Sequence, residues 1–214
     1  MIARTLTTAA LLASTIAVAA QADCPSAPGD LADGLRVTVE DGFDMILRRT
    51  DAGLIEANMF ADEAQPSLVF SRLGVLTQRY HSEDADGAIV PGTYFTVSYD
   101  SPFGQPDLAA LATAGGDWFG IVTQTAPSGE TIAWGETLWV SGVATEIAMG
   151  DCTYDMQLVQ QSAGLPGRPG DVHRYAYLPA LEVAVYLDTQ IVIDRYADLP
   201  ELPAVTRFEM LGDS

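Results

Sequence analysis

The strongest constraint on the fold is an alternation of apolar and polar residues with a period of two, which recurs along most of the chain. Between residues 35 and 39, leucine and valine alternate with arginine and threonine, as in a strand with one buried face. The same alternation follows at residues 43–48, after the turn dipeptide Asp41-Gly42, and again at 55–59, after a turn that contains Gly53. These segments predict a three-stranded antiparallel meander.

Similar patterns continue to the end of the chain and give about a dozen strands. Further strands are expected at residues 68–72, 75–81, 94–99, 118–124, 131–134, 137–147, 152–158, 174–178, 181–187, 191–195 and 205–211. Gly142 is expected to form a bulge or bend, and Pro179 to mark an edge strand or a break. The segment from Asp107 to Gly115 predicts the one short helix. The fold class is therefore all-β, or mostly β with one short helix, in which an antiparallel meander forms a curled sheet, half-barrel or barrel.

The N-terminus predicts a signal peptide over residues 1–22, followed by a single β-rich domain over residues 23–214. Arg4 precedes an apolar run at 6–20, and Ala20-Gln21-Ala22 places small residues where a signal peptidase cleaves. A membrane anchor is the alternative, but threonines and serines interrupt the run and it is short for a span. A lipid on Cys24 is disfavoured because Asp23 precedes it. We therefore expect a periplasmic or secreted protein with no integral membrane segment after cleavage.

Two cysteines, Cys24 and Cys152, remain after that cleavage. An even number of cysteines in an exported chain predicts a disulfide, and one that closes so long a loop could contribute about 4 kcal/mol to stability. Two unpaired thiols are the alternative. A redox-active pair is disfavoured because the sequence has no Cys-x-x-Cys motif.

The charge of the chain is strongly negative, with 29 acidic residues, ten basic residues that are all arginine, and a formal net charge of −19. Such a field repels nucleic acid and anionic lipid headgroups, so neither is an expected partner. Cationic partners or divalent ions would be attracted, and solubility alone is the simpler explanation.

Residues for acid–base or metal chemistry are few, since the only histidines are His81 and His173. There is no Gly-x-Ser-x-Gly motif and no zinc-binding spacing, and no cofactor is expected. The densest group of potential ligands is Glu83, Asp84 and Asp86 beside His81. These residues are a candidate calcium site, although the EF-hand pattern is incomplete and a solvated hairpin tip is the alternative.

Three tryptophans, Trp118, Trp134 and Trp139, cluster in one third of the chain. On a curled sheet they could line a concave surface and bind a ligand. Packing in the core is the alternative explanation.

The pattern as a whole resembles the periplasmic half-barrel proteins typified by lipoprotein carriers and outer-membrane-biogenesis factors. The resemblance lies in the signal peptide, the meander from Leu35 to Tyr99, and the segment Tyr175-Ala176-Tyr177-Leu178-Pro179. It implies a non-enzymatic protein that binds a hydrophobic ligand, such as an acyl chain, or an envelope protein. Two other functions remain open, namely an exported hydrolase that uses carboxylates near His81 or His173, and a structural envelope protein.

Overall fold

The computed structural model describes residues 24–40, 43–60, 67–101, 104, 113, 115–164, 170–191 and 200–212. One short 3₁₀ helix, η1, covers Pro28–Leu31, and twelve strands follow it. The strands are β1 (Leu35–Val39), β2 (Phe43–Arg49), β3 (Ile55–Phe60), β4 (Ser67–Arg72), β5 (Leu76–Ser82), β6 (Phe95–Asp100), β7 (Asp117–Thr125), β8 (Thr131–Met149), β9 (Cys152–Gly164), β10 (Asp171–Leu178), β11 (Val183–Ile191) and β12 (Val205–Met210).

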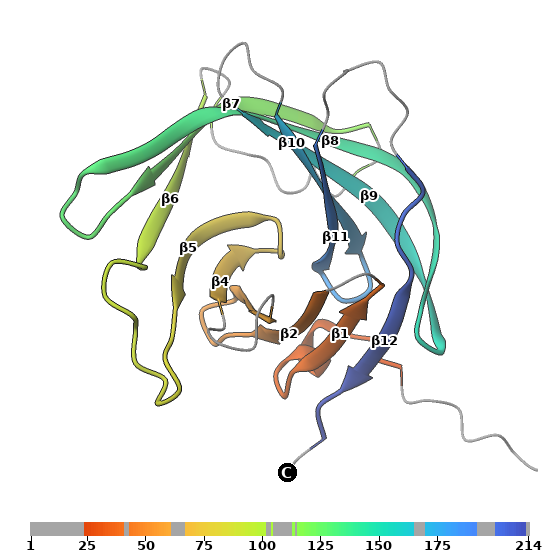
Figure 1. Cartoon of the computed structure of the whole chain (residues 1–214). Helices are drawn as coiled ribbons and strands as arrows, with labels where there is room; N and C mark the ends of the chain where they lie inside the picture. Colours follow the sequence, from red (N-terminus) through yellow and green to blue (C-terminus); the bar gives the residue numbers. More distant parts are fainter. Residues whose placement is uncertain are drawn as a thin grey trace, which may run out of the picture.

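All twelve strands form one sheet in the order β11-β10-β9-β8-β12-β1-β2-β3-β4-β5-β6-β7, and β7 also pairs with β8. This last pairing makes the sheet ring-like (Figure 1). Neighbouring strands are antiparallel except β12 and β8, which meet in parallel through the single pair Val205 and Met149. The predicted fold class, an all-β antiparallel meander in a curled sheet, is confirmed.

The predicted strands match β1 to β7 and β12 to within about two residues, whereas β9, β10 and β11 are three to six residues longer at one end than predicted. A further correction concerns β8. Residues 131–134 and 137–147, expected to be separate strands, belong to the single long strand β8. Gly135 lies at the expected break, but it continues the ladder opposite Val122, and the carbonyl of Gly164 approaches it too closely for a larger side chain. The predicted bulge near Gly142 is confirmed by a register shift between Ser141 and Ala144. The predicted signal peptide, helix and 191–195 strand lie outside the described residues, apart from a few positions at their edges.

The free edge of the sheet, β11, turns into the ring (Figure 1). There the N–H of Ala184 donates to the carbonyl of Leu73 in the β4–β5 turn (2.7 Å). Gly74 permits this approach, because its φ is +83° and an added Cβ would lie 2.3 Å from the carbonyl oxygen of Ala184. The interior of the ring is thereby divided by the β10–β11 hairpin.

One side of the hairpin faces a solid hydrophobic core. Val183, Val185 and Leu187 of β11 project into it and are fully buried. We call this cluster the packed core, and it comprises Leu31, Leu35, Val37, Val39, Met45, Leu47, Ile55, Met149, Cys152, Tyr154, Met156, Ala176, Leu178, Leu181, Val183, Val185, Leu187, Val205 and Phe208.

The N-terminal segment is attached to the packed core by the predicted disulfide. Cys24 and Cys152 are bonded, which confirms the pairing, and no free cysteine occurs among the residues described. The hydroxyl of Tyr154 donates to the carbonyl of Pro25 (2.8 Å) on the same segment. Burial raises the pKa of Tyr154 to about 12, so its phenol stays protonated. A disulfide of this kind fits an oxidising compartment.

Candidate functional site

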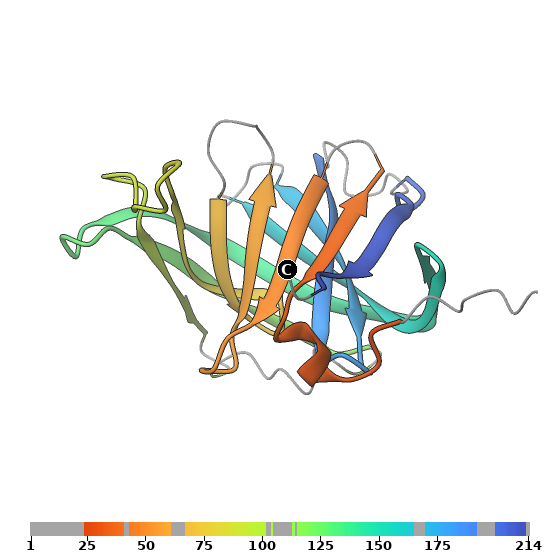
Figure 2. The ribbon, with the colours of Figure 1, turned by 90° about the horizontal axis from the view of Figure 1, so that it is seen from below.

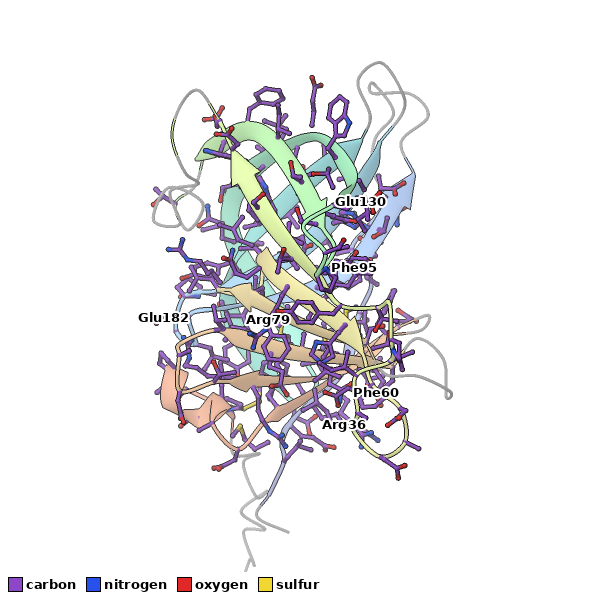
Figure 3. The ribbon with its side chains drawn as sticks, turned by 90° about the vertical axis from the view of Figure 1, so that its left-hand side faces the viewer. Arg36, Phe60, Arg79, Phe95, Glu130 and Glu182 are labelled. Atoms are coloured by element: carbon purple, nitrogen blue, oxygen red, sulfur yellow. A yellow bond between two sulfur atoms is a disulfide. The ribbon has the colours of Figure 1, made fainter. Side chains whose placement is uncertain are left out.

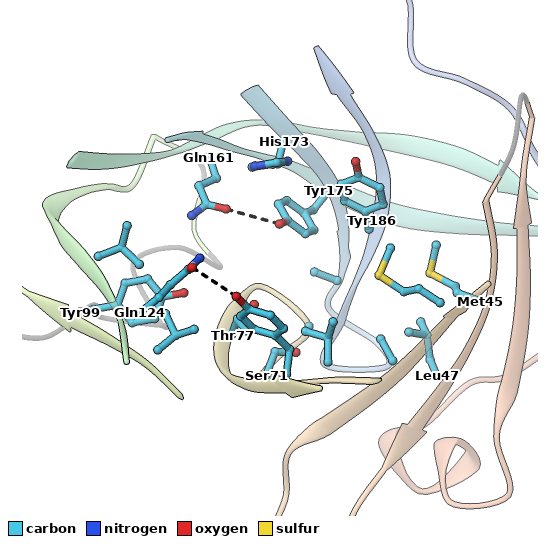
Figure 4. A pocket seen from close by; sticks show the side chains of 18 residues that line it. Met45, Leu47, Ser71, Thr77, Tyr99, Gln124, Gln161, His173, Tyr175 and Tyr186 are labelled. Carbon is cyan, nitrogen blue, oxygen red and sulfur yellow. Dashed lines mark hydrogen bonds between the residues drawn. The ribbon is translucent and has the colours of Figure 1, made fainter. Parts of the chain in front are cut away.

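The other side of the β10–β11 hairpin borders a cavity of about 420 Å³ inside the ring. This volume lies within the range of small-molecule sites, which is about 300–1,000 Å³. Figure 4 shows the 18 side chains that line the cavity. They are Met45, Leu47, Ala57, Met59, Val69, Ser71, Gly74, Thr77, Tyr80, Val97, Tyr99, Val122, Gln124, Gln161, His173, Tyr175, Ala184 and Tyr186.

Strand alternation explains why these residues face inward. On most strands the lining residues are two apart, for example Met45 and Leu47 on β2. On β5, Thr77 and Tyr80 are three apart because a register shift interrupts its pairing with β4. The apolar and polar members are not mixed evenly. Strands β2 and β3 contribute only aliphatic and methionine side chains, whereas β9 and β10 contribute only Gln161, His173 and Tyr175. The cavity therefore has an apolar wall and a wall with hydrogen-bonding groups.

Hydrogen bonds hold the polar groups in place. Tyr175 donates to Oε1 of Gln161 (3.4 Å), and Tyr80 donates to Oε1 of Gln124 (3.2 Å), as Figure 4 shows for both glutamines. Gln161 in turn donates to Thr137 (3.2 Å). In both glutamines the amide oxygen accepts a hydrogen bond from a tyrosine, which sets the orientation of the amide. The amide nitrogen of Gln124 can therefore donate to a ligand.

His173 belongs to a second polar chain at the same wall. Its Nδ1 lies 2.6 Å from the hydroxyl of Thr189, which also contacts the hydroxyl of Tyr186. No partner for Nε2 is found among the residues that the structure describes. Burial lowers the pKa of His173, outweighing the opposite effect of Asp171, so the ring is neutral at pH 7. A neutral imidazole offers its second nitrogen as a donor or an acceptor, depending on the tautomer.

The cavity lining carries no formal charge. Among the described residues that form it there is no Asp, Glu, Lys or Arg, although the whole chain has 29 acidic residues. Burial raises the pKa of Tyr175 and of Tyr99 well above that of a free phenol, so both stay protonated. The acidic side chains nearest to it, such as Asp171, lie outside the lining.

The tryptophans predicted as ligand-binding residues do not line this cavity. Trp118 and Trp139 are cross-strand partners on β7 and β8 and are buried in a second hydrophobic cluster beside the cavity. Trp139 packs near the ring of Tyr175, with 6.0 Å between ring centroids. Trp134 points to the opposite face of β8 and is 53% exposed. The structure therefore brings two of the three together and leaves the third on the outside.

The predicted cation site is a hairpin tip in the structure. The carboxylate of Asp84 accepts the backbone N–H groups of Asp86 (3.0 Å) and Ala88 (2.9 Å). Oε1 of Glu83 lies 3.0 Å from Nε2 of His81, and the ring of His81 stacks on that of Phe70. Within the described ranges, no group of three or more His, Cys, Asp or Glu residues could hold a metal ion.

The two histidines do not share a site. His81 lies on β5 and is absent from the cavity lining, whereas His173 lines it with Thr189, and not a carboxylate, as its partner. The hydrolase alternative required carboxylates around one of them. Glu83 contacts His81, which is 6% exposed, whereas Asp171 acts on His173 electrostatically and forms no hydrogen bond with it among the described residues.

Sequence reasoning missed the residues that form the polar wall. Tyr80, Gln124, Gln161, Tyr175 and Tyr186 sit on ordinary amphipathic strands, and no local motif sets them apart. A signal was available in the late strands, where His173 and Tyr175 occupy alternate positions in place of aliphatic residues. The polar residues of such strands are expected to face solvent, but here the curled sheet turns them toward the cavity.

The described residues contain no helix that is long and apolar enough to cross a membrane. Comparisons of the chain with protein-family models, with curated proteins and with solved structures found no match. The resemblance to lipoprotein carriers therefore stays a prediction.

Proposed function

We propose that this protein binds a small, uncharged and largely apolar molecule in the cavity, and that it acts as a binding protein in an oxidising compartment such as the bacterial periplasm. The observation that carries the proposal is the uncharged lining of the cavity in a chain with a net charge of −19. An ion placed there would lose its hydration and gain no opposite charge, which costs several kcal/mol.

The arrangement of the walls supports a ligand with two unlike ends. An apolar portion would contact Met45, Leu47 and Met59, each buried methylene contributing about 0.8 kcal/mol. A neutral polar group, such as a hydroxyl, amide or ester, would bond with Nε2 of His173 or with the amide of Gln124. The methionine side chains adapt to ligands of different shape. A neutral amphiphile of acyl-chain type meets both conditions.

The proposal is tested with purified protein and the uncharged fluorescent probe N-phenylnaphthylamine. We expect the probe to bind, and dodecanol to displace it at concentrations at least about tenfold lower than dodecanoate or dodecylammonium, since each tenfold change corresponds to about 1.4 kcal/mol. Equal displacement by the three would show that the lining does not select neutral ligands.

The site is located by a pair of matched substitutions. Val69→Phe adds a ring to the cavity wall, whereas Val143→Phe adds the same ring at a position that is 82% exposed. We expect the first variant to lose at least about tenfold in probe affinity and the second to keep it. Loss in both variants, or in neither, would place the binding site elsewhere. If only Val69→Phe loses affinity, mass spectrometry of organic extracts from the native protein is the next step, and it identifies the natural ligand.

A further inference from the structure

A second unusual feature lies on the outer face of the β7–β8 hairpin, away from the cavity. Six large apolar side chains project outward there, each between 38% and 53% exposed. We call this group the outer apolar patch, and its members are Phe119, Ile121, Ile132, Trp134, Leu138 and Val140. Figures 1 and 2 both show the hairpin extending past the rest of the sheet.

Strand register makes the patch continuous. Phe119 lies directly across from Leu138, and Ile132, Trp134, Leu138 and Val140 lie on one face of β8, with Glu136 between Trp134 and Leu138. The opposite face of these strands is already buried with Trp118 and Trp139, so both faces of the hairpin are apolar. Single exposed apolar side chains are common, but a contiguous patch of six marks an interaction surface.

Polar residues border the patch on both sides. On β6, Ser98 lies across from Thr123, and Asp100 across from Ile121. On β9, Ser162 lies across from Leu138, and Gln160 across from Val140. An apolar centre with a polar rim is the usual anatomy of a protein–protein interface.

The charged residues on the strands that carry and border the patch all have one sign. Strands β6 to β9 contain no Arg or Lys but carry the acidic residues Asp100, Asp117, Glu136, Glu146 and Asp155. Among the residues described, none of these carboxylates forms an ion pair. Glu136 lies within the patch, across from Ile121. In Figure 3, Arg36 and Arg79 lie below the hairpin that ends at Glu130.

From this combination we propose that the outer apolar patch is the docking surface for another protein, one that presents an apolar surface rimmed by Arg or Lys. A second copy of this chain is the wrong partner, because it would bring Glu136 and its neighbours against their own copies at a net charge of −19 each. A bilayer with anionic headgroups is repelled by the same charges. Basic residues around the partner's apolar centre would pair with these free carboxylates.

The test places a photo-crosslinking amino acid at Leu138 or Trp134 of the full-length chain in the cells that produce it, with Ser67 as an exposed control on β4. We expect both patch positions to yield the same protein adduct and Ser67 to yield none. The adducted protein is then purified and its affinity for the native chain is measured. Trp134→Ala and Glu136→Arg should each weaken binding about tenfold or more, and added salt should weaken binding by the native chain.

Several outcomes would overturn the proposal. These are the absence of an adduct at both patch positions, a chain that sediments as a dimer until Leu138 is changed to Asp, and co-sedimentation with vesicles of anionic phospholipid. Binding that rises with salt, or that Glu136→Arg strengthens, would exclude a basic rim on the partner. The cavity variant Val69→Phe should dock as the native chain does, so the two proposals can fail separately.

Discussion

The two sides of the β10–β11 hairpin are built from the same two strands and yet differ in how they are filled. On one side Val183, Val185 and Leu187 belong to the packed core, together with buried side chains of β1, β2 and β12. On the other side Tyr175, Tyr186 and His173 face a cavity of about 420 Å³. One half of the interior is therefore packed for stability, while the other half is less fully packed and keeps space for a ligand.

Removing the disulfide should have the largest effect on the packed side. Cys24→Ala with Cys152→Ala opens a loop whose ends are 128 residues apart, which should lower the free energy of unfolding by about 5 kcal/mol on the chain-entropy estimate. Urea denaturation with and without reductant measures it. If the comparison holds, probe affinity of the folded variant stays unchanged, because neither cysteine lines the cavity. A loss of affinity in the folded state would show that the two sides are coupled.

Substitution of a large side chain by alanine should lower the free energy of unfolding by different amounts on the two sides of the β10–β11 hairpin. Leu187→Ala removes a fully buried side chain from the packed core and should cost about 2–5 kcal/mol. Met59→Ala removes a half-buried side chain that already borders the cavity, so it leaves less new empty volume and should cost about 1 kcal/mol. Denaturant titration of both variants checks the difference. Equal costs would mean that the cavity side is packed as tightly as the other.

The cavity side should also show a dependence on pH that the packed side lacks. Burial lowers the pKa of His173, so as the pH falls below about 6.5 the unfolded chain takes up a proton before the folded chain does. The contribution of the neutral ring to stability is therefore present above this pH and is lost as the pH falls toward the folded-state pKa.

Thermal unfolding from pH 7.5 to 5 should accordingly show a smaller decrease in stability for His173→Gln than for the native chain. The difference between the two curves isolates this group from the ionisable groups that both proteins share. Parallel curves would contradict the assignment of a depressed pKa to His173.

The smallest effect is expected on the outside of the sheet. Trp134→Ala removes a side chain that is 53% exposed and belongs to neither core cluster, so the free energy of unfolding should change by no more than about 0.5 kcal/mol. Trp139→Ala is the matched comparison, because Trp139 is fully buried on the same strand and should cost about 3–5 kcal/mol. A large cost at Trp134 would mean that the outer apolar patch is needed for folding.

Much of this fold follows from local patterns in the sequence. Period-two alternation located the strands of β1 to β7 to within about two residues, because each has one buried face. It divided β8 in two at Gly135, whereas pairing with β7 and β9 on either side holds that segment extended. The cysteine pairing was also predictable, since only two cysteines are present.

The site was not predictable in the same way. Its lining comes from nine strands, and which face of each strand turns inward depends on how the sheet curls. His173 faces the cavity only because the β10–β11 hairpin folds into the ring, which no local pattern encodes. The tryptophans illustrate the same limit, since Trp134 and Trp139 differ by an odd number of positions on one strand and so point to opposite faces.

Among the residues that the structure describes, the single residue pair between β12 and β8 leaves most of one edge of β12 without a neighbouring strand. Such an edge is a template on which a strand of another molecule can grow, and it is the usual starting point for aggregation of β-proteins. Two features of β12 oppose this. The strand has only six residues, and Arg207 and Glu209 stand exposed on it as a charged pair with 3.6 Å between side-chain atoms. The opening in the ring is thus protected against self-association by the charges beside it.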